Sequence, residues 1–305
     1  MARRRGAARS AGAVAVVLAV GVTAVAGVVL FLSSRDPAPA REVCAARLDG
    51  AEHALSPIQA QNTAMIVGTS VRRGLPARAA TIGVATAMQE SRIVNIDYGD
   101  RDSVGLFQQR PSQGWGTVEQ IMDPLYSTGA FYDGLVEVDG WESLEVTDAA
   151  QAVQRSAFPQ AYAQHEEMAR AWASSLTGHS PGSVTCDLPS VTEGDPAGAA
   201  GATDLTDRLV RDLGLPQGRT ASIGTPAGDG SVTVGIDATA LPYDDVTRST
   251  WAVAHWAVAT AAATGVTEVR ADDQVWTRRA AQWSSVDERD VPAPGTVEVT
   301  VGAAG

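Results

Sequence analysis

The chain has 305 residues, of which 45% are hydrophobic, and a formal net charge of −12. This length predicts about two domains. The charge arises from 35 acidic and 23 basic residues, and no basic patch offsets it, so the composition excludes a nucleic-acid partner on electrostatic grounds.

The N-terminal segment has the pattern of an exported protein. Residues 1–10 carry Arg3, Arg4, Arg5 and Arg9 and no acid, and residues 11–32 carry no charge. An apolar segment needs about 20 residues to cross a bilayer as a helix. The pattern therefore predicts a cytoplasmic basic segment at 1–10, a transmembrane helix at 11–32 and a linker at 33–43. We expect a cell-membrane location, single-pass with the bulk of the chain extracytoplasmic, or secretion if the chain is cleaved after Ala40.

The next segment carries helix signals. Ser56 followed by Pro57 predicts a helix start, with an end at Gly74, and Pro76 predicts the start of a second helix that runs to Glu90. Further along the chain, Thr117 begins a capping-box pattern, Pro124 and Pro159 predict helix breaks, Thr147 begins a long helical region and Gly178 ends it. No strand pattern is evident, so residues 44–186 are predicted to form an all-α domain.

The remaining sequence alternates between helix-like and strand-like patterns. Residues 187–203 are rich in small residues and acids and predict a linker. Residues 204–305 predict a small α+β domain of unknown function. Its predicted helices are 205–213 and 245–264, and its predicted strands are 231–236, 267–270, 274–276 and 296–301. The expected fold class is mainly α: an all-α domain, then a small α+β domain, with an N-terminal transmembrane helix.

The two cysteines, Cys44 and Cys186, bracket the predicted all-α domain. In an exported protein, an even pair in this arrangement predicts a disulfide, and two free buried thiols are the alternative. Closing so long a loop would stabilise the fold by about 5 kcal/mol in the chain-entropy model.

A candidate acid lies at the end of an apolar helix. Residues 79–88 are almost wholly small or apolar, and Glu90 follows them at the boundary between core and solvent. Burial disfavours the charged form of a carboxyl and raises its pKa. A raised carboxyl pKa is what a general acid needs near neutral pH.

The sequence around Glu90 resembles the lysozyme-like superfamily, and within it the soluble lytic transglycosylases and goose-type lysozymes. The matching residues are Glu90-Ser91 and, further on, Ser103-Val104-Gly105-Leu106-Phe107-Gln108. The stretch from Asp97 to Gly116 is similar to a lysozyme-like domain of actinobacterial cell-wall proteins. The resemblance covers roughly residues 55–176.

The resemblance implies a lysozyme-like catalytic domain at 44–186 that cleaves peptidoglycan between N-acetylmuramic acid and N-acetylglucosamine. Glu90 would be the general acid and base of a lytic transglycosylase, an enzyme that needs no second carboxylate. The alternatives are a hydrolytic lysozyme and a non-catalytic cell-wall-binding or assembly protein. A third is that the C-terminal domain is the functional part and the lysozyme-like domain a tether.

Polar residues near Glu90 are the other site candidates. Ser91 is expected to orient Glu90 or to cap its helix. Together with Gln108, Gln109 and Tyr162, it is also a candidate for binding the substrate. A hydrolase would need a partner carboxylate within about 5–10 Å. The candidates for that carboxylate are Asp97, Asp100 and Asp102. Weaker binding candidates are Gln113 and Gln154, while Phe107 and Trp115 are expected in the core or the cleft wall.

No cofactor or metal is expected. His53, His165, His179 and His255 are scattered without ligand spacing, and the acidic loop lacks the closing Glu of a calcium loop. His255 is expected to be structural. The expected partners are peptidoglycan glycan strands, the membrane through the N-terminal helix, and a protein partner through the C-terminal domain.

Overall fold

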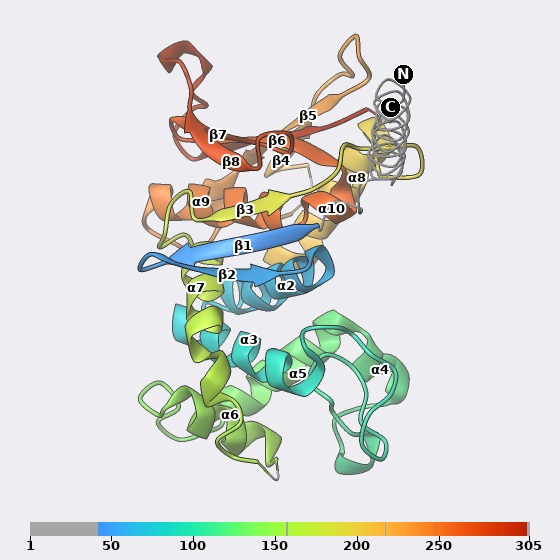
Figure 1. The fold of residues 1–305 in the computed structure, drawn as a ribbon, viewed down its shortest axis with the longest axis vertical. Coiled ribbons are helices and arrows are strands. Elements are labelled where there is room, and N and C mark those ends of the chain that lie inside the picture. Colours follow the sequence, from blue (N-terminus) through green and yellow to red (C-terminus); the bar gives the residue numbers. More distant parts are fainter. Residues whose placement is uncertain (1–41, 157, 217, 304–305) are drawn as a thin grey trace, which may run out of the picture. The chain divides into compact units, whose positions relative to one another are not determined.

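Two antiparallel sheets run through the part of the chain that the structure describes, residues 42–303 without 157 and 217 (Figure 1). In this computed structural model, 44% of the described residues are helical and 18% lie in strands. The prediction of a mainly α chain is therefore wrong.

The predicted basic segment, transmembrane anchor and most of the first linker lie outside the described residues. Within residues 42–303, no helix is long and apolar enough to cross a membrane. The helices α2 and α8, among the longest described, have 16 residues each, fewer than the roughly 20 that a bilayer requires. The predicted single-pass membrane location is therefore not supported by any described helix. The disulfide described below fits an extracellular protein.

A three-stranded sheet contradicts the prediction that residues 44–186 are all-α. Its order is β2 (Ala51–Leu55), β1 (Val43–Leu48) and β3 (Val184–Asp187), with both pairings antiparallel. Strands β1 and β2 are rich in Ala and contain few β-branched residues, and β3 has only four residues, so the three sequences carry little strand signal. The overlooked signal was the turn: Asp49 and Gly50 both have positive φ, 52° and 80°, as an Asp-Gly hairpin requires.

The predicted disulfide between Cys44 and Cys186 is confirmed. The two residues are directly opposed in the β1–β3 register, and both are buried. The bond joins positions 142 residues apart and so links the first and last residues of the predicted domain 44–186.

The helix starts are confirmed where capping residues indicated them. Ser56 caps α2 (Pro57–Arg72) in a capping box with Gln59, and Thr117 does the same with Gln120 for α4 (Val118–Met122). Pro124 separates α4 from α5 (Pro124–Val136). The helix that carries Glu90 is α3 (Ala77–Ser91), with Pro76 at its N-cap.

The long helical region predicted from Thr147 consists of separate pieces. Helix α6 (Val146–Gln154) ends well before Pro159, and α7 (Glu166–Leu176) begins after a short 3-10 turn at 163–165. Helix α3 packs against α2, α5, α6 and α7, so its central residues are fully buried. The middle of α3 is thereby fixed in the core, while residues 88–90 near its C-terminal end are half-buried.

The C-terminal part forms a six-stranded antiparallel sheet. Buried and accessible residues alternate along the inner strands, as expected for a sheet with one covered face. The predicted strands are confirmed, whereas β4 and β8, which are short and carry mostly accessible side chains, were not predicted. The sheet order is β4 (Ala221–Ile223), β5 (Val232–Asp237), β9 (Thr296–Val301), β6 (Val266–Ala271), β7 (Gln274–Thr277), β8 (Gln282–Ser285).

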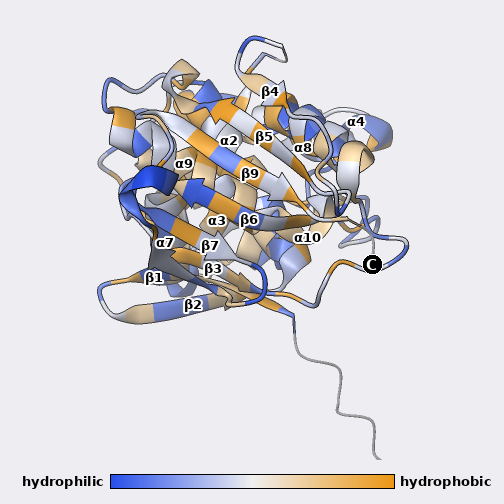
Figure 2. Cartoon of the chain, turned by 90° about the horizontal axis from the view of Figure 1, so that it is seen from above, coloured by the Kyte–Doolittle hydropathy of each residue, from blue (hydrophilic) through white to orange (hydrophobic). Residues whose placement is uncertain are grey.

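Three helices accompany this sheet: α8 (Gly198–Leu213), α9 (Val246–Ala259) and α10 (Ala261–Thr264). Helix α9 contacts β6 and β9 on one side and β3, α2 and α7 on the other, so it lies between the two sheets (Figure 1). Figure 2 shows the opposite face of the larger sheet, where β5, β9, β6 and β7 lie side by side. The described residues from 42 to 303 consequently form one compact unit.

Candidate functional site

Helix α3 ends at Ser91, one residue after the candidate acid, with a tight backbone cap. Arg92 and Ile93 adopt left-handed conformations, with φ of 56° and 57°, and their N–H groups donate to the carbonyls of Met88 and Ala87. These bonds satisfy carbonyls that the end of the helix would otherwise leave unpaired. The backbone that carries Glu90 is therefore fixed in place.

The carboxyl of Glu90 is half-buried and hydrogen-bonded. The hydroxyl of Tyr162 donates to Glu90 Oε1 at 2.6 Å, and the side chain of Gln154 makes a second hydrogen bond to the carboxyl. Burial raises the pKa of Glu90 above 4.5, and the two hydrogen bonds partly oppose that rise by favouring the charged form. The net result is a carboxyl that stays protonated to higher pH than an ordinary glutamate.

The two partners of Glu90 are themselves anchored. The ring of Tyr162 is fully buried, and burial together with the nearby Glu90 raises the pKa of its hydroxyl, so that it remains a donor. Gln154 lies at the end of α6, and its Nε2 also donates to the carbonyl of Phe107 at 2.7 Å. Gln154 thus connects the acid to the Gly105–Gln109 segment.

Ser91 and Gln109 hold that segment in place. Ser91 Oγ is buried and donates to the carbonyl of Leu106 at 2.7 Å, while Gln109 Nε2 donates to the carbonyl of Ser127 at 3.0 Å. A backbone bond from Val104 to Gln109 closes the turn. In this geometry Ser91 acts on the scaffold, and Gln109 presents only its unpaired Oε1 for a further hydrogen bond.

Gln108 lies at the tip of the turn with an unusual backbone. Its φ is 48°, a backbone conformation that residues other than glycine rarely adopt. Its Nε2 donates to the carbonyl of Tyr98 at 3.2 Å, so it ties the acidic loop to the turn. Gln108 also lines the same cavity as Glu90.

The three candidate carboxylates have different environments. Asp100 is exposed and lines the cavity with Glu90, whereas Asp97 is exposed and does not line it. Asp102 accepts hydrogen bonds from Arg110 Nε at 2.8 Å and from the backbone N–H and hydroxyl of Ser112. These bonds hold the pKa of Asp102 far below its usual value. The carboxylate of Asp102 therefore stabilises the loop. Of the three candidates, Asp100 is the one that lines the cavity with Glu90.

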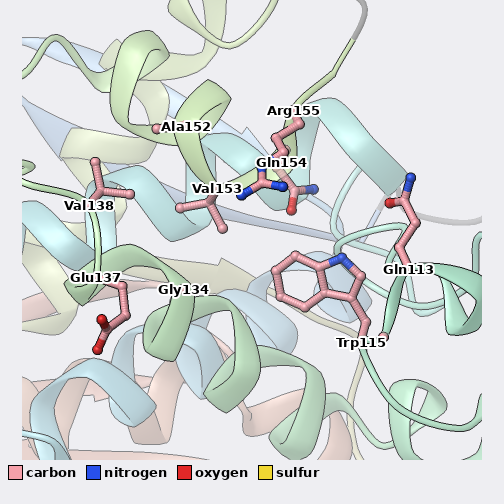
Figure 3. Close-up of a pocket in the computed structure, with 10 residues that line it drawn as sticks. Gln113, Trp115, Gly134, Glu137, Val138, Ala152, Val153, Gln154 and Arg155 are labelled. Carbon is pink, nitrogen blue, oxygen red and sulfur yellow. The ribbon is translucent and has the colours of Figure 1, made fainter.

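The cavity at Glu90 has a volume of about 460 Å³, and a second cavity of about 630 Å³ lies beside it. Figure 3 shows the second cavity, with the indole of Trp115 below Gln154 and Arg155. Four residues line both cavities, which therefore adjoin; they are Gln113, Trp115, Gln154 and Arg155. Phe107, by contrast, is buried and stacks on Phe131.

The cavity at Glu90 is lined by cations that the sequence did not single out. Arg101, Arg110 and Arg155 all line it. Arg110 is paired with Asp102, but Arg155 is exposed and has no ion pair among the described residues. Arg101 and Arg155 have positive φ, as does Gln108. Such backbone conformations gather at functional sites, but sequence does not reveal them in residues other than glycine.

No group of three or more His, Cys, Asp or Glu residues that could hold a metal ion occurs in the described part of the chain. No protein-family model matches the chain. A search of curated proteins likewise finds no significant match.

Proposed function

We propose that the protein cleaves the glycan backbone of peptidoglycan between N-acetylmuramic acid and N-acetylglucosamine, as an enzyme of the lysozyme-like superfamily. The proposal is carried by Glu90, a half-buried carboxyl with a raised pKa that faces a cavity and is bonded to Tyr162. General acids of glycosidases need a carboxyl of this kind.

The reaction would use Glu90 twice. Its protonated form donates a proton to the glycosidic oxygen as the bond to the muramic acid anomeric carbon breaks. The resulting carboxylate then takes the proton of the attacking hydroxyl, which restores the acid. Tyr162 and Gln154 stabilise the carboxylate between the two steps, because both make hydrogen bonds to it.

A lytic transglycosylase is the outcome that we favour. There, the 6-hydroxyl of the muramic acid attacks its own anomeric carbon, with help from the neighbouring N-acetyl group, and a 1,6-anhydro sugar results. No protein carboxylate is needed on the opposite face. Of the three candidate carboxylates, Asp102 is occupied by Arg110 and Asp97 does not line the cavity.

A hydrolytic lysozyme is the second candidate, and one observation favours it. Asp100 lines the cavity with Glu90, and its nearest cation, Arg101, lies 3.9 Å away, so its carboxylate is not held by a short hydrogen bond to that cation. In a hydrolase, such a carboxylate would activate water or form a glycosyl intermediate.

The cations of the cavity support an anionic glycan as substrate. The peptide stems of peptidoglycan carry carboxylates, as do lactyl groups that lack a stem, whereas chitin-like glycans carry none. Arg155 is available to bind such a group, although the chain as a whole has a net charge of −12. The local charge therefore matches this substrate better than a neutral one.

The test incubates the full chain with purified peptidoglycan and identifies the released fragments by mass spectrometry. Anhydro fragments, one water lighter than hydrolysis products, are expected, and ordinary reducing ends would identify the hydrolase. Glu90→Gln should lower the rate by about 10²–10⁴-fold, while Glu167→Gln, an exposed carboxyl on α7, should not change it. Binding without release of fragments would refute the enzyme and favour a non-catalytic wall-binding protein.

A further inference from the structure

A cavity of about 710 Å³ lies beside the outer face of the larger sheet and shares no lining residue with the two cavities at Glu90. Strands β6, β7 and β9 contribute Thr267, Thr277 and Thr300 to its wall, and Figure 2 shows these strands side by side. The segment that follows β3 contributes the apolar side chains of Leu188 and Val191. The site proposed above uses none of these residues.

A buried arginine forms part of this wall. Arg278 is only 7% exposed, and its guanidinium donates to three backbone carbonyls. The acceptors are Pro189, reached from Nε, and Ala261 and Val266, reached from Nη1 at 3.1 and 3.3 Å. Because the side chain is buried, its charge is poorly solvated, and burial lowers the pKa of Arg278.

The charge of Arg278 has no close counter-ion. No carboxylate of the described residues lies within ion-pair distance, and Asp195 and Glu42 act on it only from further away. Its Nη2 makes no hydrogen bond within residues 42–303 and is not among the buried unpaired atoms. Because Arg278 lines the cavity and its Nε and Nη1 are engaged, Nη2 is the guanidinium nitrogen left for a ligand there.

The other charges at the wall reinforce this arrangement. Arg279 also lines the cavity, is exposed, and forms no ion pair with any described residue. The two acids of the wall are already engaged: Asp229 accepts from the N–H and hydroxyl of Ser231, and Glu268 accepts from Arg270 Nε at 2.7 Å. Among the described charged side chains of the wall, Arg278, Arg279 and Asp229 form no ion pair, so the unpaired charges sum to one positive charge.

We propose that this cavity binds a small organic molecule through its carboxylate or phosphate group. The anionic group accepts hydrogen bonds from Arg278 Nη2 and Arg279, and the apolar part of the ligand packs on Leu188 and Val191. A buried cation without a counter-ion is unfavourable, and an anion that supplies one gains charge-assisted hydrogen bonds. The site is independent of the glycan-cleaving activity proposed above.

The test is a titration of the full chain, by calorimetry and by amide NMR, with three probes of the same shape. Benzoate and phenyl phosphate carry the two anionic groups, and benzamide is the neutral control. We expect at least one anion to bind about tenfold more tightly than benzamide, with an affinity that falls as salt is added. Which anion binds more tightly identifies the ligand group. The amide signals of Gly302 and Thr300 should shift.

Arg279→Gln is the diagnostic variant, because Arg279 is exposed and its loss leaves the buried Arg278 in place. It should weaken binding of the preferred anion about fivefold to tenfold. Arg219→Gln removes the same charge from an exposed position outside the cavity and should leave the affinity unchanged. The proposal is overturned if no anion binds, if benzamide binds equally well, or if the two variants have the same effect.

Discussion

Glu90 is positioned by groups that belong to three different elements. Its backbone ends α3, Tyr162 follows α6, and Gln154 joins the carboxyl to the carbonyl of Phe107. A carboxyl held in this way keeps its geometry when its protonation changes, because both partners can donate to the carboxylate. The raised pKa of Glu90 thus results from burial in a rigid frame.

Tyr162→Phe removes the donor to Glu90 and tests this arrangement. Because this hydrogen bond lowers the pKa of Glu90, its loss should raise that pKa further and move the alkaline limb of the kcat/KM profile to higher pH. The maximal rate should fall about tenfold to a hundredfold, as expected for a lost hydrogen bond to a charged group. Tyr132→Phe is the control, since the Tyr132 hydroxyl donates to Ile66 in the core. A pH profile identical to that of the parent protein would contradict the proposed role of Tyr162.

Arg155→Gln tests the preference for an anionic glycan. An exposed ion pair contributes about 0.2–1 kcal/mol, so we expect KM for peptidoglycan to rise about twofold to fivefold at low salt, with kcat unchanged. The difference should disappear at high salt. Arg170→Gln removes an exposed charge outside the two adjoining cavities and is the control. An unchanged KM in Arg155→Gln would remove Arg155 from substrate binding.

At this scale the sequence indicated candidates, but not their contacts. Glu90, Gln108 and Tyr162 were named because they match a motif or carry suitable groups. Ser91 and Gln109 were named with them, although their side chains mainly hold the backbone turn at Leu106. Arg155 was missed because its position depends on a left-handed residue after α6, which no sequence pattern marks in an arginine.

Among the elements, those with local signals were predicted well. The caps at Ser56 and Thr117 and the break at Pro124 act within one turn of the chain, so sequence suffices to locate them. Strands β1 and β3 depend on a partner far away along the chain and on the disulfide between them. The buried alanines of β1 have low strand propensity and β3 has only four residues, so the sequence of residues 44–186 carries little strand signal.

Helices α2 and α8 approach each other closely at Gly68. A Cβ atom at this position would lie 2.7 Å from the backbone oxygen of Asp212, which cannot move without shifting α8. Gly68→Ala should therefore lower the unfolding free energy by about 1–3 kcal/mol, measured by chemical denaturation. Gly228→Ala, with open space around the added methyl group, is the matched control and should change stability little. Equal stability of the two variants would contradict the close packing.

On the scale of the whole molecule, α9 joins the sheet of the C-terminal part to the helices around Glu90. His255 on this helix is fully buried. Its Nε2 accepts from the N–H of Ser183 at 3.2 Å, and its Nδ1 pairs with the carbonyl of Ser175 at 2.8 Å. The ring is therefore held neutral, as the prediction of a structural histidine requires.

This buried ring predicts sensitivity to acid. Burial lowers the pKa of His255 from 6.5 to about 4, so the unfolded chain takes up a proton before the folded protein does. As the pH falls from 6.5 to 4, the folded state should lose on the order of 3 kcal/mol through this residue alone. The unfolding free energies of the parent protein and of His255→Gln, plotted against pH, should converge as the pH falls over this range. His53→Gln, at a position that is not buried, is the control, and its unfolding free energy should change with pH as that of the parent protein does. The same parallel behaviour in His255→Gln would refute the prediction.

The disulfide also determines how the molecule would bear mechanical load. A force applied between Val43 and the C-terminal sheet passes from Cys44 directly to Cys186, because these residues lie side by side at the entry and exit of the loop. The 142-residue loop that carries Glu90 then bears no tension. Once the bond is reduced, the same force can peel β1 from β3 and release about 500 Å of extended chain. Stretching of single molecules with and without a reductant would show this difference as an additional unfolding step.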